Sequence, residues 1–234
     1  MIRSVLRGIA VCGAALAAVA LYGGRGASAA VMTPSPSVGS GLASVAGDEV
    51  AVFSGGCFWG VQAVFQHMNG VTSAVSGYSG GSLKNPGYSQ VSTGTTGHAE
   101  SVRVTFDPSK VAYADLLRVF FSVAADPTEL NYQGPDHGTQ YRSVIWYTTD
   151  AQKNTATAYI DQLTKAKTYA NKIVTEVKPA EAFYNAEGYH QDYATLHPDD
   201  GYIAYNDAPK VLNLKKFFPK LYRDQPVLVG STQP

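Results

Sequence analysis

The sequence predicts an α/β (α+β) fold: a two-layer sandwich with a mixed sheet, flanking helices and long coil segments. Short apolar runs with the pattern of strands alternate along the chain with runs whose apolar side chains recur every three or four residues. Two long stretches, 77–98 and 126–142, carry neither pattern. Hydrophobic residues make up 45% of the 234 residues, which is enough for one core.

The first half of the predicted domain alternates strands and helices. Residues 49–54 form a short apolar run typical of a buried strand, and residues 59–68 place apolar side chains at helical spacing. A second strand is expected at 71–75. Apolar and polar residues alternate over 102–106, which indicates a half-buried strand, and an amphipathic helix is expected over 111–121.

The second half is less regular. Residues 143–147 predict a strand, 150–163 a helix that begins with a capping aspartate, and 174–177 another strand. Residues 181–209 are aromatic and irregular, with at most one short helix around 187–196.

The two ends of the chain are expected to lie outside the globular domain, which spans 49–222. Residues 1–29 have a basic start, an apolar stretch and a small-residue cleavage site, the pattern of a signal peptide. We therefore expect a periplasmic or secreted protein without stable membrane association after cleavage; an uncleaved anchor is the alternative. Residues 30–48, rich in Ser, Pro, Gly and Ala, predict a flexible linker, and 223–234 a loose tail.

Composition argues against several classes of protein. The 18 basic and 18 acidic side chains cancel, so nucleic acid and anionic membranes are not expected as partners. The five histidines are scattered, and the mature chain would hold a single thiol, so we predict no metal site. No glycine-rich phosphate loop is followed by a lysine, and we expect no bound cofactor.

The motif Gly-Gly-Cys-Phe-Trp-Gly at 55–60 is the strongest functional signal. Cys57 lies where the first predicted strand meets the first predicted helix. A thiol at a helix start faces free backbone N–H groups and the positive end of the helix dipole, which favour the nucleophilic thiolate. We therefore expect a lowered pKa for Cys57. The alternative is a buried structural cysteine.

Four further residues have side chains that suit a reaction at this thiol. Glu100 precedes an apolar strand, where burial would raise its pKa and keep it protonated as a general acid; the alternative is a solvated glutamate. Tyr88 and Tyr141 carry hydroxyls that could hold a substrate oxygen, and Asp136 could accept an N–H. Each of these three is otherwise an ordinary surface or packing residue, and His190 is expected to be structural.

Six motifs, in order, resemble the A-type peptide methionine sulfoxide reductases, and the resemblance spans about 49–222. They are Gly-Cys-Phe-Trp-Gly at 56–60, Gly-Tyr-Ser-Gly-Gly at 77–81, Gly-Thr-Thr-Gly-His-Ala-Glu at 94–100, Asp-Pro-Thr at 126–128, Gly-Thr-Gln-Tyr-Arg-Ser at 138–143 and Tyr-His-Gln at 189–191.

The resemblance implies that the domain reduces methionine-S-sulfoxide, free or in oxidised proteins, to methionine, with one such enzyme for each sulfoxide epimer. It implies that water leaves and a cysteine sulfenic acid remains. The implied roles are attack on sulfur by Cys57, protonation of the oxygen by Glu100 with Tyr88 and Tyr141, a methyl slot made by Phe58 and Trp59, and orientation of the substrate N–H by Asp136.

The chain departs from the family pattern in two places. It lacks the further cysteines with which many members resolve the sulfenic acid; Ser92 and the segment after Lys210 offer no thiol. An external thiol is therefore expected as reductant: a thioredoxin-like protein, a glutaredoxin-like protein or a small thiol. Ala125 stands where the family often has histidine. We expect a monomer.

Two other functions remain open. A one-cysteine thiol peroxidase would share the sulfenic acid but would consume peroxide and would not need paired tyrosines. A redox sensor or peptide-binding module would keep the aromatic residues but tolerate loss of Glu100. Turnover of a methyl sulfoxide distinguishes the reductase from both.

Overall fold

The computed structural model describes residues 30–231, so the signal peptide expected at 1–29 lies outside the described residues. A six-stranded sheet with the order β7-β6-β1-β3-β2-β8 forms one layer. Only β6 and β7 pair in parallel among these strands, so the sheet is mixed, as predicted. The strands are β1 (Glu49–Ser54), β2 (Val71–Ser79), β3 (Ala99–Phe106), β6 (Val144–Tyr147), β7 (Glu176–Pro179) and β8 (Phe183–Asn185).

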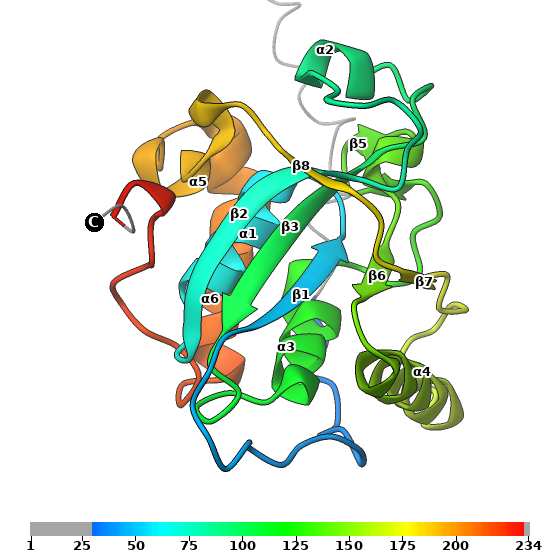
Figure 1. Ribbon diagram of the computed structural model, residues 1–234, viewed down its shortest axis with the longest axis vertical. Coiled ribbons are helices and arrows are strands. Elements are labelled where there is room, and N and C mark those ends of the chain that lie inside the picture. Colours follow the sequence, from blue (N-terminus) through cyan, green and yellow to red (C-terminus); the bar gives the residue numbers. More distant parts are fainter. Residues whose placement is uncertain (1–29, 232–234) are drawn as a thin grey trace, which may run out of the picture.

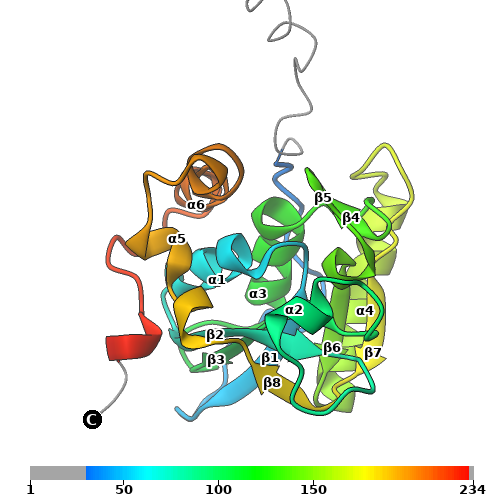
Figure 2. The ribbon, with the colours of Figure 1, turned by 90° about the horizontal axis from the view of Figure 1, so that it is seen from above.

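Helices form the second layer. Viewed from above, α1, α3 and α6 lie on one face of the sheet and α4 lies beside its β6–β7 end (Figures 1 and 2). The longer helices are α1 (Phe58–Gln66), α3 (Tyr113–Val119), α4 (Asp150–Lys165) and α6 (Ala208–Phe217). Short elements are α2 (Tyr88–Val91), α5 (Tyr193–Leu196), the β4 (Tyr132–Gln133) and β5 (Asp136–His137) ribbon, and π-helical turns at Phe120–Ala124 and Ile203–Asp207.

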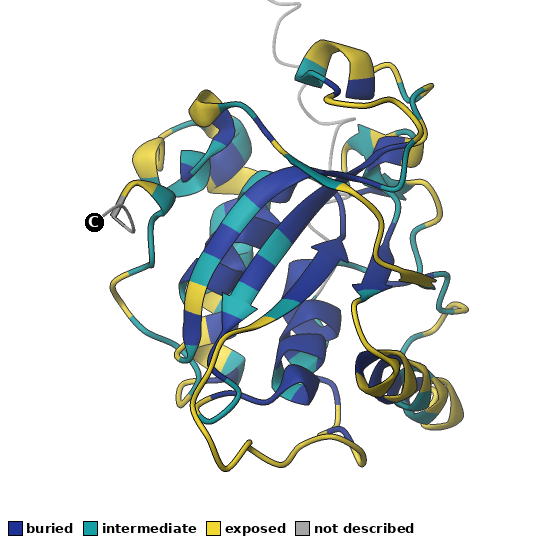
Figure 3. Ribbon diagram, in the orientation of Figure 1, coloured by how far each residue is buried: buried dark blue, intermediate teal, exposed yellow. Residues whose placement is uncertain are grey.

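The core lies between the sheet and the α1–α3 layer, where the central strands are buried (Figure 3). The ring of Phe53 on β1 stacks on Phe65 of α1 at 5.0 Å and on Phe120 at 5.2 Å between centroids. This packing holds the β1–α1 junction, and therefore Cys57, against the hydrophobic core.

The structure adds elements that the sequence patterns do not reveal. Strand β2 runs on to Ser79, the long coil at 77–98 contains α2, and the irregular stretch 181–209 contains β8. Helix α6 was not predicted. Its pattern is weak because Leu214 is its one fully buried residue, and a proline lies in its first turn.

Hydrogen bonds join residues on both sides of the 49–222 domain to its helices. Segment 30–48 has no helix or strand, but Val31 N donates to Ser122 O at 3.2 Å. Thr33 is buried, and its hydroxyl accepts a 2.7 Å hydrogen bond from Tyr159 of α4. In the C-terminal segment, Arg223 Nε donates to a backbone carbonyl at the end of α1 at 3.0 Å. Polar side chains hold both segments to the helices.

None of the helices between residues 30 and 231 combines the length and the apolar character that crossing a bilayer requires.

Candidate active site

Cys57 occupies the turn between β1 and α1, where the sequence placed it. It is the N-cap residue of α1, without a side-chain capping hydrogen bond, and the backbone N–H of Trp59 acts to lower the pKa of its thiol. Gly56, just before it, has a φ of +89°, and a Cβ there would lie 2.6 Å from Cβ of Gln133. Glycine is therefore needed at this position both for its backbone conformation and for the close approach of the β4 segment.

The pKa of Cys57 differs from the expectation. Burial raises the pKa of the thiol well above its ordinary value, and the carboxyl groups of Glu100 and Asp207 raise it further. The Trp59 N–H and the ammonium of Lys210 oppose this shift without reversing it. The prediction of a lowered pKa for Cys57 was wrong. It considered only the local effect of the helix start, whereas burial in a medium of low dielectric and two carboxyl groups from distant segments raise the pKa of the same sulfur.

Glu100 is buried beside this turn, as predicted for a general acid. Its side chain is on β3 and is 2% exposed, and Oε2 accepts a 2.9 Å hydrogen bond from the backbone N–H of Phe58. Burial raises the pKa of Glu100 to about 8; the Phe58 N–H lowers it, and the Asp136 and Asp207 carboxyls add to the rise. At neutral pH the acid is therefore protonated.

The two predicted tyrosines share the surroundings of the thiol and the acid. Tyr88 is the first residue of α2, and Tyr141 ends a 3-10 turn. Burial raises the pKa of each hydroxyl, and both Glu100 and Cys57 raise it further. Both hydroxyls therefore stay protonated and can donate hydrogen bonds to a substrate oxygen.

Asp136 is paired with a residue that the sequence analysis missed. The hydroxyl of Tyr202, the residue before the Ile203–Asp207 π-helical turn, donates a short hydrogen bond to the Asp136 carboxylate. Burial raises the pKa of Asp136. The signal available in the sequence was only the aromatic character of 181–209, which does not single out Tyr202.

Phe58 and Trp59 occupy the first turn of α1 but differ in exposure. Phe58 is 1% exposed, and its ring packs in the core against Tyr78 and His190. Trp59 is partly exposed; it stacks on Tyr193 at 3.9 Å and donates from Nε1 to His190 Nδ1 at 3.2 Å. Trp59 therefore presents the accessible apolar surface, and His190 is buried between the Phe58 and Trp59 rings.

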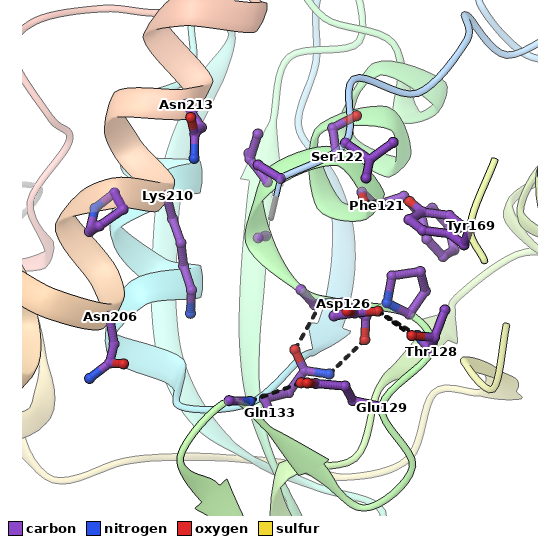
Figure 4. A pocket seen from close by; sticks show the side chains of 18 of the residues that line it. Phe121, Ser122, Asp126, Thr128, Glu129, Gln133, Tyr169, Asn206, Lys210 and Asn213 are labelled. Carbon is purple, nitrogen blue, oxygen red and sulfur yellow. Dashed lines mark hydrogen bonds between the residues drawn. The ribbon is translucent and has the colours of Figure 1, made fainter. Parts of the chain in front are cut away.

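Cys57 lines a cavity of about 270 Å³. Figure 4 shows this cavity from close by. Asn206 and Lys210 project into it from the α6 side, facing Asp126, Glu129 and Gln133. Its lining also includes Asp136 and Tyr202 but not Glu100, Tyr88 or Tyr141. Cys57 thus belongs both to the acid–tyrosine group and to the cavity.

Asp207 and Lys210 were not found from the sequence. Their side chains form an ion pair in which Lys210 Nζ lies 3.1 Å from Asp207 Oδ1. Both charges affect the pKa of Cys57. Ala125 lines the cavity and packs close to Gly55; nothing in the structure explains the loss of histidine there. Within residues 30–231 no three His, Cys, Asp or Glu side chains gather as metal ligands.

The family model for peptide methionine sulfoxide reductase matches residues 49–221. A peptide methionine sulfoxide reductase MsrA 2 from Mesorhizobium japonicum is 61% identical over 185 residues, which cover 79% of this chain and 95% of that protein. MsrA from Polynucleobacter asymbioticus is 49% identical, covering 76% and 93%.

Comparison with solved structures points to the same family as the sequence relatives. Reduced Mxr1 of Saccharomyces cerevisiae superposes with a TM-score of 0.59 at 32% identity, covering 66% of this chain and 88% of that one. Methionine sulfoxide reductase A of Corynebacterium diphtheriae gives 0.56 at 34% identity, covering 71% and 83%. The chain therefore belongs to the peptide methionine sulfoxide reductase family, and within it to the A-type enzymes, which reduce methionine-S-sulfoxide to methionine.

Proposed function

We propose that this chain repairs oxidised proteins by a single-thiol cycle, in which Cys57 becomes a sulfenic acid and an external thiol restores it. The observation that carries the proposal is the placement of one thiol beside one buried, protonated carboxylic acid. Residues 30–231 contain no second cysteine to form a disulfide with Cys57.

The chemical step couples attack to proton delivery. The Cys57 thiolate attacks the sulfoxide sulfur and forms a sulfur–sulfur bond, while Glu100 delivers its proton to the sulfoxide oxygen. The sulfur–oxygen bond breaks, and with a second proton the oxygen leaves as water. Water then attacks Cys57 Sγ, and methionine departs with the electron pair. The net change is one sulfoxide and one thiol to one thioether and one sulfenic acid.

The surrounding residues orient the substrate. Tyr88 and Tyr141 donate hydrogen bonds to the oxygen as it gains charge, because both hydroxyls are held protonated. The partly exposed ring of Trp59 contacts the methyl group, with Phe58 supporting it from the core. Asp136, fixed by Tyr202, accepts the backbone N–H of the oxidised methionine.

The second half-reaction needs two external thiol groups. They convert the sulfenic acid to the thiol and form one disulfide and one water, so the electrons balance. The reductant is a thioredoxin-like protein, a glutaredoxin-like protein or a small thiol.

The enzyme acts as a monomer in the periplasm or after secretion. Sequencing the N-terminus of the protein from cell fractions tests export, and Ala30 is the expected first residue.

A single turnover without reductant tests the mechanism. The full chain is mixed with peptides that carry either sulfoxide epimer and with a sulfenic-acid trap, and the adduct is located by peptide mass spectrometry. The expected result is about one methionine per enzyme from the S epimer alone, with the adduct on Cys57. Cys57→Ser is the control. Efficient consumption of peroxide without turnover of either epimer would instead establish a thiol peroxidase.

A further inference from the structure

The second charged group at the site is the Asp207–Lys210 ion pair. Asp207 ends the π-helical turn, and its side chain is 0% exposed; Lys210 is in the first turn of α6, with a side chain 19% exposed. One oxygen of Asp207 accepts from Lys210, and the other has no hydrogen-bond partner. A buried carboxylate is stable only with a nearby cation, so the two side chains are held together.

This pair packs against the helix turn that begins at Cys57. Gly60 lies three residues after Cys57, on the same side of α1. A Cβ at Gly60 would lie 2.1 Å from Asp207 Oδ1 and 3.0 Å from Lys210 Nζ. The missing side chain of Gly60 therefore makes the space in which the ion pair sits.

The ammonium group also shares an open space with the thiol. Lys210 and Cys57 line the same cavity, and the Lys210 side chain extends into it from α6 (Figure 4). The charged and titratable groups around Cys57 come from every neighbouring element. They are Glu100 on β3, Tyr202 just before the π-helical turn, Asp207 at its end, Lys210 on α6, Tyr88 on α2 and Tyr141 on the 3-10 turn. Among these groups around Cys57, Lys210 is the one that carries a positive charge.

The reaction sets opposite demands on the thiol and the acid. Burial keeps protons on both Cys57 and Glu100, but attack requires the thiol to lose its proton while the acid keeps one. Lys210 lowers the pKa of Cys57 against the larger rise from burial, Glu100 and Asp207, whereas the pKa of Glu100 is set mainly by burial, the Phe58 N–H, Asp136 and Asp207. A cation on the cavity side therefore favours thiolate without ionising the acid.

We propose that Lys210 is the counter-ion of the Cys57 thiolate, and that Asp207, seated against Gly60, is the ion-pair partner that offsets part of its charge. The proposal rests on Cys57 being the nucleophile. It assigns a role in the reaction to two residues of the C-terminal helix region, far along the chain from the Cys-Phe-Trp motif.

The test is the pH profile of Cys57 alkylation by iodoacetamide, measured on the full chain with the adduct located by mass spectrometry. Lys210→Met is expected to move the profile up by about one pH unit, so that alkylation at pH 8 slows about tenfold. Lys210→Arg keeps the charge and should restore most of the rate. Lys216→Met, the same change at an exposed position of α6, is the matched control and should leave the profile unchanged.

Asp207→Asn is expected to move the alkylation profile of Cys57 in the opposite direction, to lower pH. It removes a carboxylate that raises the pKa of Cys57, so alkylation should become faster at pH 8. A purely structural pair would loosen the site in both variants, and shifts in the same direction would overturn the proposal. So would a Lys210→Met profile that matches Lys216→Met.

One more variant guards against misfolding. Should Lys210→Met fail to fold, the double variant Asp207→Asn with Lys210→Met leaves no unpaired buried charge. The alkylation profile of the double variant should lie at higher pH than that of Asp207→Asn and, where Lys210→Met folds, at lower pH than that of Lys210→Met. A profile identical to that of Asp207→Asn contradicts the role of Lys210. Alkylation needs no sulfoxide, so its outcome is separable from that of the single-turnover experiment.

Discussion

The backbone N–H of Phe58 donates a 2.9 Å hydrogen bond to Oε2 of Glu100. The peptide unit that follows the nucleophile thus fixes the buried acid in place. Because Phe58 is in the first turn of α1 and its ring is in the core, the acid cannot move without disturbing the helix that presents Cys57. The distance between thiol and acid is therefore set by the fold rather than by flexible side chains.

Glu100→Gln tests the acid. Glutamine can still accept the Phe58 N–H but has no proton to give, so the rate of sulfoxide reduction should fall by about 10²–10⁴-fold. Glu181→Gln, at an exposed position, is the matched control and should keep full activity. Methionine formation under single-turnover conditions is the measurement. Unchanged turnover in Glu100→Gln would remove the residue from the proposed mechanism.

The pH profile follows from the two raised pKa values. The reactive form carries one proton shared between Cys57 and Glu100, and below pH 8 both groups are protonated. We expect kcat/KM to rise about tenfold per pH unit up to about pH 8, and then to level off until Cys57 itself ionises. Initial rates from pH 6 to 10 with an S-sulfoxide peptide measure this. A profile that falls steadily between pH 6 and 8 contradicts it.

Stability should depend on pH through the same carboxyl. The pKa of Glu100 is raised in the folded state, so the unfolded chain loses this proton first, and the free energy of unfolding falls as pH rises from about 4.5 to about 8. A difference of one between the folded-state and unfolded-state pKa corresponds to about 1.4 kcal/mol. Glu100→Gln should therefore be more stable than the parent at pH 8 but not at pH 4.5. Urea unfolding at both pH values provides the measurement, and an equal difference at the two would argue against a buried acid.

The sequence patterns correctly predicted the features that depend only on neighbouring residues in the chain. The β1–α1 junction, the alternation in β3 and the placement of Cys57 follow from apolar spacing within a few residues. The raised pKa of Cys57 could not be predicted, because it depends first on burial by the whole fold and then on carboxyls on β3 and in the Ile203–Asp207 turn. The Asp207–Lys210 pair was missed for the same reason: its significance depends on a glycine far away in the chain.

The segment before the sheet offers a test of how firmly it is held. Thr33 Oγ1 lies 2.7 Å from both Ser122 Oγ and the Tyr159 hydroxyl, in a buried cluster. Thr33→Val keeps the shape but removes these hydrogen bonds, so we expect a loss of about 1–2 kcal/mol of unfolding free energy. Ser35→Ala, at an exposed position, is the control. The urea midpoint measures both; equal midpoints for the two variants would mean that residues 30–48 behave as a free linker.

The glycine beneath the ion pair makes a sharper prediction about packing at the site. Gly60→Ala would place a Cβ 2.1 Å from Asp207 Oδ1, a distance that forces the Asp207–Lys210 pair away from α1. Alanine normally favours a helix by about 1 kcal/mol over glycine, so a loss of stability of about 1–3 kcal/mol here would come from the clash. Gly201→Ala is the matched control, because it is also helical and has no atom within 4 Å of its Cβ position. Thermal unfolding of the two variants should therefore move in opposite directions, and a Gly60→Ala variant as stable as Gly201→Ala would show that the pair needs no such space.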